Sequence, residues 1–379
     1  MTYAIVGKQI FDGNRLLPNH AIVVSGKTIA EVIPQEQLSK QIPVDYELTE
    51  GILIPGLIDL QLNGGGGVLF NDTPTVEGIR EIGNTHRRFG TTGFLPTLIS
   101  TDLNSMVQAI GAVDEALRAA VPGVLGIHLE GPFLSPHRAG IHNASKFCVI
   151  DNKGLELITS LKNGVTLLTL APEKTSPETI RRIVATGAVV CAGHSDADYN
   201  TIQAALDAGV SGFTHLFNAM SPLTSREPGM VGAALSDDNS WFGIIADGHH
   251  VHPATFKAAI AAKKRGGAVL VTDAMPTVGA KQSSFTLNGE TISSANGRCL
   301  NAAGVLAGSD LNMILAVNNA AKYASIDWLE AVRMASAYPA RAIGVDHHLG
   351  YLKPNYTANI VAVNAQREVV HSWINGVGL

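Results

Sequence analysis

The stretch VLGIHLEGP (residues 124–132) is a short apolar run that stops at a glutamate and then turns at Gly-Pro. Three further stretches share this layout: VVCAGHS (189–195), GFTHLFNAM (212–220) and VLVTDAMP (269–276). Each pattern predicts a buried β-strand that delivers one polar residue to its carboxyl end. These residues are Glu130, His194, His215 and Asp273. Polar residues at the carboxyl ends of several parallel strands are typical of the active-site face of a barrel.

The rest of the central region repeats this alternation of apolar strands and amphipathic helices from Gly51 onward. Strands are expected near Ile52–Leu62, Gly93–Leu98, Val124–Glu130, Val165–Leu170, Ala188–Gly193, Gly212–Leu216, Trp241–Ala246 and Ala268–Asp273. Helices are expected between most of them, at Val76–Phe89, Leu103–Ala119, Pro177–Thr186, Tyr199–Ala208 and Pro253–Lys264. Eight parallel strands with intervening helices predict an α/β fold of the TIM type, a (β/α)8 barrel.

Both ends of the chain have strand character instead. The first fifty residues contain short apolar runs joined by turn residues at 12–14 and 25–27, which is hairpin-like spacing. After the eighth strand come an excursion at Ser283–Leu306 rich in Gly, Asn and Ser, two helical stretches, and a tail that returns to strand character. We therefore predict a small β-sandwich domain built from residues 1–53 and 346–379, and a barrel over residues 54–345.

Two rival nucleotide-binding interpretations find no support in the motifs. A doubly wound open sheet is the alternative fold, but no GxGxxG follows the first strand to favour a dinucleotide site. The glycine run Gly64–Gly67 lacks the Lys-Ser/Thr of a phosphate-binding P-loop. We expect it to form a flexible turn.

Composition limits the class of partner and the compartment. The chain has 379 residues, is 46% hydrophobic and carries a formal charge of −5, so neither nucleic acid nor a membrane is an expected partner. Its three cysteines are scattered without a CxxC pair, which favours reduced thiols over disulfides. The first residues contain Asp12 and no continuous apolar core, so no signal peptide is expected. We expect a cytoplasmic protein.

The residue types at the strand ends favour metal chemistry. Carboxylate and imidazole are ligands that a divalent ion such as zinc prefers, and Glu130, His194 and His215 lie on separate predicted strands. Asp273, if it stays off the metal, is a candidate general base for the water. A structural interpretation stays open for each residue: Glu130 could pair with a nearby basic residue, and Asp273 could simply form a turn.

The motifs resemble those of the amidohydrolase superfamily and, within it, the N-acetylglucosamine-6-phosphate deacetylase family. The resemblance rests on PGLIDLQLNGGGGVLFND (55–72), GIHLEGPFLSPHRAGIH (126–142), AGHSDAD (192–198), THLFNAMSPLTSREPG (214–229), ADGHHV (246–251), VTDAM (271–275) and LAGS (306–309). They occur in one order over most of the chain. The family's small β-domain also fits the two flanking regions.

The resemblance implies a single metal ion. Many amidohydrolases carry HxH on the first strand for a second metal, whereas this chain has Gln61 and Asn63, two amides that are poor metal ligands. This departure resembles the mononuclear deacetylases, so one divalent ion per subunit is implied. Its ligands would be Glu130, His194 and His215. Zinc is the preferred ion, and Fe, Co, Mn or Ni would also suit the set.

Catalytic and substrate-binding roles also follow from the resemblance. Asp273 would take a proton from the metal-bound water and deliver it to the departing amine, and His250 would polarise the acetyl carbonyl. His249 fits the family pattern less well. Arg226 would bind the phosphate, arriving from the neighbouring subunit of a homodimer. The other implied substrate contacts are Ile141, His142, Asn218, Ala219, His250, Leu306, Ala307 and Gly308.

The expected reaction is hydrolysis of the N-acetyl group of N-acetylglucosamine 6-phosphate, giving glucosamine 6-phosphate and acetate in amino-sugar catabolism and recycling. Two alternatives stay open. One keeps the mechanism and changes the substrate to an epimer, N-acetylgalactosamine 6-phosphate. The other is a non-catalytic barrel relative that works as an assembly protein, which would be expected to have lost metal ligands or the strand-eight aspartate.

Overall fold

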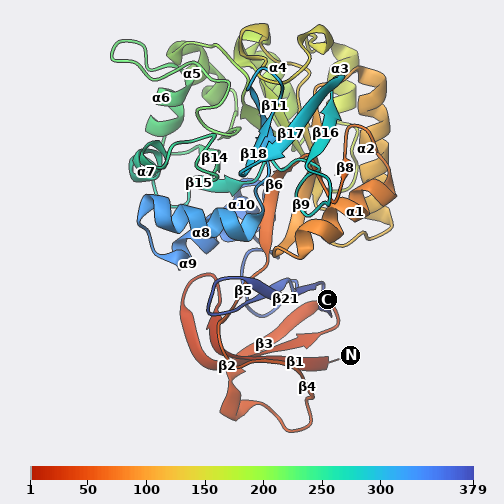
Figure 1. Cartoon of the computed structure of the whole chain (residues 1–379), viewed down its shortest axis with the longest axis vertical. Helices are drawn as coiled ribbons and strands as arrows, with labels where there is room; N and C mark the ends of the chain where they lie inside the picture. Colours follow the sequence, from red (N-terminus) through yellow and green to blue (C-terminus); the bar gives the residue numbers. More distant parts are fainter. Residues whose placement is uncertain (1) are drawn as a thin grey trace.

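The chain folds into a large α/β barrel and a smaller, mostly β domain (Figure 1). The architecture is that of a computed structural model, which describes residues 2–379. Both ends of the chain lie in the smaller domain, and the barrel is formed by the residues between them (Figure 1). Within residues 2–379, no helix is both long and apolar enough to cross a membrane.

Eight parallel strands form the barrel, as predicted. Their order is β15-β14-β13-β12-β11-β10-β9-β6, so every strand except the two at the ends lies between its sequence neighbours. The strands are β6 (Leu57–Leu62), β9 (Thr91–Ile99), β10 (Gly126–Glu130), β11 (Val165–Leu170), β12 (Val189–Ala192), β13 (Gly212–Phe213), β14 (Trp241–Ile245) and β15 (Ala268–Val271). The ring is completed by a parallel bridge between Leu62 and Ala274.

Helices alternate with the barrel strands, and most of them begin at a side chain that caps them. Thr75, Asp102 and Ser176 each accept a hydrogen bond from a backbone N–H in the first turn, which satisfies a donor that the helix leaves free. The helices are α1 (Val76–Arg87), α2 (Leu103–Arg118), α3 (Asn152–Ile158), α4 (Pro177–Val184), α5 (Tyr199–Asp207), α6 (Gly229–Ser236), α7 (Pro253–Ala262), α8 (Met313–Ala324), α9 (Trp328–Met334) and α10 (Ala337–Ala342). Sequence periodicity missed the short helices α3, α6 and α10.

The first predicted strand is in fact two strands in different sheets. The stretch 52–62 breaks at Gly56: β5 (Ile52–Pro55) joins the smaller domain and β6 joins the barrel. A Cβ at Gly56 would lie 2.0 Å from the Thr92 hydroxyl oxygen, so only glycine lets the chain pass this close to β9. The apolar pattern continues across the break because both halves are buried.

The smaller domain combines strands from both ends of the chain, as predicted. Its strands belong to one hydrogen-bonded sheet, in which β20 pairs with both β5 and β21. They are β1 (Thr2–Phe11), β2 (Leu16–Ser25), β3 (Thr28–Pro34), β4 (Val44–Leu48), β5, β20 (Ile360–Val363), β21 (Val369–Ile374) and β22 (Val377–Gly378). The domain has its own apolar core around the fully buried Trp373.

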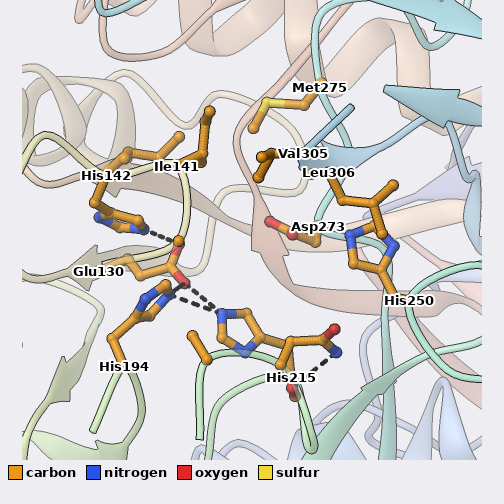
Figure 2. Close-up of a pocket in the computed structure, with 15 residues that line it drawn as sticks. Glu130, Ile141, His142, His194, His215, His250, Asp273, Met275, Val305 and Leu306 are labelled. Atoms are coloured by element: carbon orange, nitrogen blue, oxygen red, sulfur yellow. Dashed lines mark hydrogen bonds and ion pairs between the residues drawn. The ribbon is translucent and has the colours of Figure 1, made fainter. Parts of the chain in front are cut away.

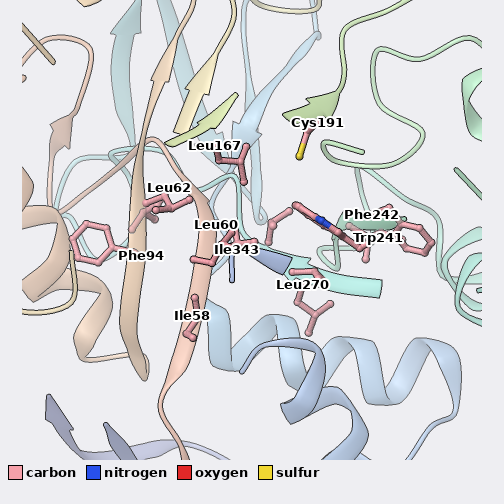
Figure 3. Close-up of a cluster of buried hydrophobic side chains, with 14 of the residues drawn as sticks. Ile58, Leu60, Leu62, Phe94, Leu167, Cys191, Trp241, Phe242, Leu270 and Ile343 are labelled. Atoms are coloured by element: carbon pink, nitrogen blue, oxygen red, sulfur yellow. The ribbon is translucent and has the colours of Figure 1, made fainter. Parts of the chain in front are cut away.

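The barrel interior contains both apolar and polar buried side chains. Leu60, Leu167 and Leu270 are buried in the apolar core, where Trp241 also packs (Figure 3). Buried polar side chains lie beside them: His128, which pairs in register with Leu167, lies between Thr97 and Thr169, with ring-nitrogen-to-hydroxyl distances of 3.3 and 2.8 Å. The carboxyl ends of the strands therefore meet over a polar layer, which supports the candidate site.

The excursion after the eighth strand is an ordered antiparallel sheet. It contains β16 (Ser284–Leu287), β17 (Glu290–Ala295), β18 (Arg298–Leu300) and β19 (Leu306–Ser309). The sequence indicated only a region rich in Gly, Asn and Ser, because its strands are short and mostly exposed. Two further two-residue strands, β7 (Gly64–Gly65) and β8 (Val68–Leu69), pair within the glycine-rich turn.

Candidate metal centre and active site

The four residues singled out by the strand-end pattern all lie at the carboxyl end of the barrel. Glu130 is the last residue of β10, while His194, His215 and Asp273 each follow their strand by two residues. These three adopt the left-handed backbone region, with φ values of 48°, 35° and 53°. Such conformations are costly for residues with a Cβ and cluster at functional sites.

Close strand packing fixes the position of His194. The residue before it is Gly193, where a Cβ would lie 2.6 Å from Thr169 Cγ2 and 2.9 Å from Thr214 Cβ. Glycine therefore lets β11, β12 and β13 come together at this level. The imidazole of His194 is thereby brought next to that of His215, which follows the neighbouring strand β13.

Three potential ligand atoms converge at this point (Figure 2). Nε2 of His194 and Nε2 of His215 are 3.0 Å apart, and they lie 3.3 and 3.0 Å from Glu130 Oε1. Within residues 2–379, these are the only three His, Cys, Asp or Glu side chains grouped closely enough to hold a metal ion. In a tetrahedral zinc site with bonds of about 2.0–2.1 Å, neighbouring ligand atoms are about 3.3 Å apart. The donor set therefore fits a tetrahedral divalent ion.

Hydrogen bonding prepares His194 as a ligand. Its Nδ1 lies 2.9 Å from the backbone carbonyl oxygen of Arg138, which can only accept a hydrogen bond. The proton of the neutral ring is therefore on Nδ1, and the lone pair of Nε2 faces Glu130 and His215. His215 differs: its Nδ1 is buried and has no hydrogen-bond partner within residues 2–379, so no such contact orients this ring.

The electrostatics of the cluster favour an ionised carboxylate. Burial alone would raise the pKa of Glu130, but the adjacent imidazoles of His194 and His215, together with the nearby His142, hold it well below its usual range. Burial would likewise lower the pKa of His215, yet the Glu130 carboxylate raises it above its ordinary value. A buried carboxylate that stays charged among imidazoles is suited to cation binding.

Asp273 faces this cluster across the pocket (Figure 2), and two side-chain amides hold its carboxylate. Its Oδ1 accepts hydrogen bonds from Gln61 Nε2 at 3.1 Å and Asn63 Nδ2 at 2.6 Å. Gln61 Nε2 also donates to Glu130 Oε1 at 3.0 Å. Burial, reinforced by the negative charge of Glu130, raises the pKa of Asp273 to about 6. The two amides thus hold the carboxylates from the end of β6, the first barrel strand, at the positions where proteins with an HxH motif have histidines.

The structure adds Asp247, to which sequence reasoning gave no role. Its Oδ2 lies 2.6 Å from His250 Nδ1, and its Oδ1 accepts the backbone N–H groups of His249 and His250. Asp247 therefore fixes the ring of His250, whose side chain is almost completely buried beside the pocket. The available signal was its position: like the other site residues, it lies just beyond a barrel strand, here β14.

A second addition is Ser100, which lies directly after β9. Its hydroxyl oxygen is 2.8 Å from His142 Nδ1 and also donates to the backbone oxygen of Glu130 at 3.2 Å. The ring of His142 is thereby held with Nε2 4.0 Å from Glu130 Oε2. Burial and the nearby His194 lower the pKa of His142 to about 3, so this ring is neutral at physiological pH.

These groups surround a cavity of about 180 Å³ at the mouth of the barrel. Most of the predicted substrate contacts line it: Ile141, His142, Asn218, Ala219, His250, Leu306 and Gly308. Ala307 does not, because its side chain is buried in the apolar cluster behind the cavity. Arg226 does not either: it lies in the loop between β13 and α6, whose residues 222–227 are all exposed. Ile99, Gly140, Met275 and Val305 complete the wall, and sequence reasoning had not selected them.

Comparisons with known proteins agree with this geometry. Residues 52–378 match the model of the amidohydrolase family, and residues 2–46 match the NagA composite domain. An N-acetylgalactosamine-6-phosphate deacetylase of Shewanella is 44% identical over 87% of this chain and 84% of its own. An N-acetylglucosamine-6-phosphate deacetylase of Haemophilus influenzae is 36% identical over 99% of both chains. The crystal structure of N-acetylglucosamine-6-phosphate deacetylase from Pasteurella multocida superposes with a TM-score of 0.97 at 35% identity, covering 100% of both chains.

The chain belongs to the amidohydrolase family, whose members are metal-dependent hydrolases. Within that family it groups with the amino-sugar-phosphate deacetylases just described, as the sequence motifs predicted. The predicted fold, a barrel with a separate β-rich domain, is confirmed by the same comparisons.

Proposed function

We propose that this protein hydrolyses the acetamide bond of N-acetylglucosamine 6-phosphate to give glucosamine 6-phosphate and acetate. The observation that carries the proposal is the juxtaposition, across one cavity, of a Glu-His-His cluster and the buried carboxylate of Asp273. Hydrolytic metal sites use this combination of three protein ligands and a separate base. The names of the relatives supply the substrate class.

The chain's own residues account for the proton transfers and the charge stabilisation. Asp273 Oδ1 is held by the two amides, which leaves Oδ2 to take a proton from the attacking water. As the new C–O bond forms and the C–N bond breaks, Asp273 returns that proton to the amine. With a proton on each ring nitrogen, His250 donates through Nδ1 to the Asp247 carboxylate and through Nε2 to the oxygen of the acetyl group, where negative charge develops.

A divalent cation held by Glu130, His194 and His215 would supply Lewis-acid activation of the water and of the acetyl carbonyl. Zinc is the ion we propose, because two imidazole nitrogens and one carboxylate oxygen form a common zinc donor set. We also propose a cytoplasmic location, because the three cysteines are free within the described residues, and two of them are buried.

We further propose a homodimer in which Arg226 binds the phosphate in the neighbouring subunit. Within residues 2–379, the residues that line the cavity include no lysine or arginine, so this lining offers a bound phosphate no fixed positive charge. Arg226 lies in an exposed loop that also carries Leu223, whose side chain is 55% exposed. A second subunit would cover this apolar residue and bring the guanidinium to the open end of a cavity.

The substrate assignment is tested by steady-state kinetics on three compounds: N-acetylglucosamine, its 6-phosphate and N-acetylgalactosamine 6-phosphate. We expect kcat/KM for the 6-phosphate of N-acetylglucosamine to exceed that for the unphosphorylated sugar by at least ~10-fold, because a charge-assisted phosphate contact contributes about 1.5–3 kcal/mol. Hydrolysis of none of the three by metal-loaded protein would refute the proposed reaction.

The epimeric substrate stays as a second candidate. The Shewanella relative, which shares 44% identity with this chain, is named for N-acetylgalactosamine 6-phosphate. The two sugars differ in the orientation of one hydroxyl group, so a single contact in the cavity could decide between them. A higher kcat/KM for the galactose epimer in the same assay would transfer the assignment to that substrate.

Mixing two inactive variants tests the shared site. Arg226→Ala and Asp273→Asn each damage both sites of a homodimer, but a heterodimer combines one doubly damaged site with one intact site. After subunit exchange we expect recovery of up to about one quarter of wild-type activity, the share of intact sites under random pairing. Proven exchange without any recovery would show that each chain supplies its own arginine.

A further inference from the structure

The sheet inserted after β15 crosses the front of the barrel (Figure 1). We call the first three strands of this sheet, which span residues 284–300, the flap. Its strands β16 and β17, and β17 and β18, pair in antiparallel register through two-residue turns. Its base is tied to the barrel by Asp310, whose carboxylate accepts hydrogen bonds from Thr277 at 2.8 Å and Ser294 at 2.9 Å.

Both turns of the flap are Asn-Gly pairs. Asn288 and Gly289 have φ values of 52° and 84°, and Asn296 and Gly297 have 52° and 76°. Positive φ at both central residues defines the type I′ turn, which matches the twist of the flanking strands and favours Asn-Gly. The positions of both turn tips are therefore well defined by local sequence, although the flap itself is mostly exposed.

Each turn makes one side-chain hydrogen bond to a loop outside the flap. Asn288 Nδ2 donates to the backbone oxygen of Ile141 at 3.1 Å. At the other turn, His249 Nε2 lies 3.1 Å from the backbone oxygen of Asn296, which can only accept. The flap thus contacts the loop after β10 at one tip and the loop after β14 at the other.

These two loops form opposite walls of the active-site cavity. The first carries His142, which adjoins Glu130, and the second carries Asp247 and His250. Figure 2 shows His142 on the side of the Glu-His-His cluster and His250 on the side of Asp273. The apolar cluster under the flap, which includes Leu287 and Ile292, also contains Ile99 and Met275 from the cavity wall.

We propose that the flap is a brace that sets the distance between the two walls, with Asn288 and His249 as its positioning residues. This inference rests on the proposed deacetylase reaction only for the choice of substrate. The two links do not touch the reacting groups, so they act by placing the loops that hold the sugar phosphate and His250. His249 thus has a role distinct from that of its neighbour His250.

A matched pair of variants tests the first link. Asn288→Asp removes the donor to Ile141, whereas Asn296→Asp makes the same chemical change at the other turn and keeps the backbone oxygen that His249 uses. Aspartate tolerates the left-handed conformation of these turns. We expect Asn288→Asp to raise KM about three- to tenfold, with a smaller change in kcat and an unchanged metal content, and Asn296→Asp to match wild type.

Hydrogen-exchange mass spectrometry of the substrate-free, metal-loaded protein distinguishes a brace from a local contact. In Asn288→Asp, exchange should accelerate both in residues 136–146 and in the far loop, residues 247–252. Acceleration near residue 141 alone, or none, would overturn the proposal. This measurement needs no turnover, so it stays decisive even if wild-type protein fails to hydrolyse the proposed substrate.

The second link provides an independent check. His249→Ala should reproduce the increase in KM and accelerate exchange in the opposite loop, residues 136–146. His249→Gln offers another hydrogen-bond donor to Asn296, so its increase in KM should be smaller. Because either loss releases the same brace, the double variant with Asn288→Asp should be no worse than the more damaging single variant. Additive effects on KM would show two unrelated contacts and contradict the proposal.

Discussion

Replacing Asp273 with asparagine is expected to lower kcat by at least ~10²-fold, the scale of general acid–base catalysis. The new side chain keeps the size of the old one, and its carbonyl oxygen can still accept the hydrogen bonds from Gln61 and Asn63. It cannot carry a proton from water to the amine. Steady-state kinetics and metal analysis on the same sample measure the effect, and metal content should be unchanged.

Asp238→Asn is a suitable control, because Asp238 is an exposed carboxylate that pairs with Lys264 and does not line the cavity. It should leave kcat at the wild-type value. A kcat of Asp273→Asn close to the wild-type value would show that Asp273 is not the base. If Asp273→Asn loses its metal and regains activity when metal is resupplied, Asp273 is a ligand and not the base.

The pH profile gives the same assignment a second test. A base works only when deprotonated, so wild-type kcat/KM should fall as the pH drops through the pKa of Asp273. Burial and Glu130 raise that pKa to about 6, and the positive charge of a bound cation would lower it. We therefore expect an acid limb at or below about pH 6 in the wild type. The residual activity of Asp273→Asn should lack this limb.

Strand-end patterns were enough to predict most of this site, because a parallel barrel places the carboxyl ends of all its strands at one face. Residues that end parallel strands meet at one face of the sheet, so Glu130, His194, His215 and Asp273 converge although they are far apart in sequence. Their residue types then restrict the chemistry. The same logic, applied to the strand that ends at Ile245, would have selected Asp247 as well.

Other features depend on tertiary contacts that no periodicity encodes. The break at Gly56 follows from its contact with Thr92, and an apolar pattern that is buried on both sides of the break cannot show it. The flap contains Asn-Gly turn signals, but its alternation is too short and too exposed to predict which loops the tips would reach. The partners of Ser100 likewise lie far from it in the sequence, at the end of β10 and in the loop after β10.

Loss of a metal ligand is the other change with a large expected effect. Substitution of residues that merely orient a ligand costs about 10–100-fold in metal affinity or activity, so His215→Ala, which removes a ligand, should exceed ~10²-fold. His137→Ala is the matched control, because that ring is exposed and does not line the cavity. Metal analysis after dialysis and activity measured before and after metal addition provide the readout.

The same metal analysis decides the stoichiometry, which we expect to be about one tightly bound divalent ion per chain. In place of a second pair of imidazoles, Gln61 and Asn63 direct amide N–H groups at Glu130 and Asp273, with donor-to-oxygen distances between 2.6 and 3.1 Å. The positive ends of these amide dipoles already stabilise the carboxylates that a second cation would need, and they would repel it. Two ions at full occupancy in the purified protein would therefore show that both amides rotate to present oxygen, and the mononuclear assignment would be wrong.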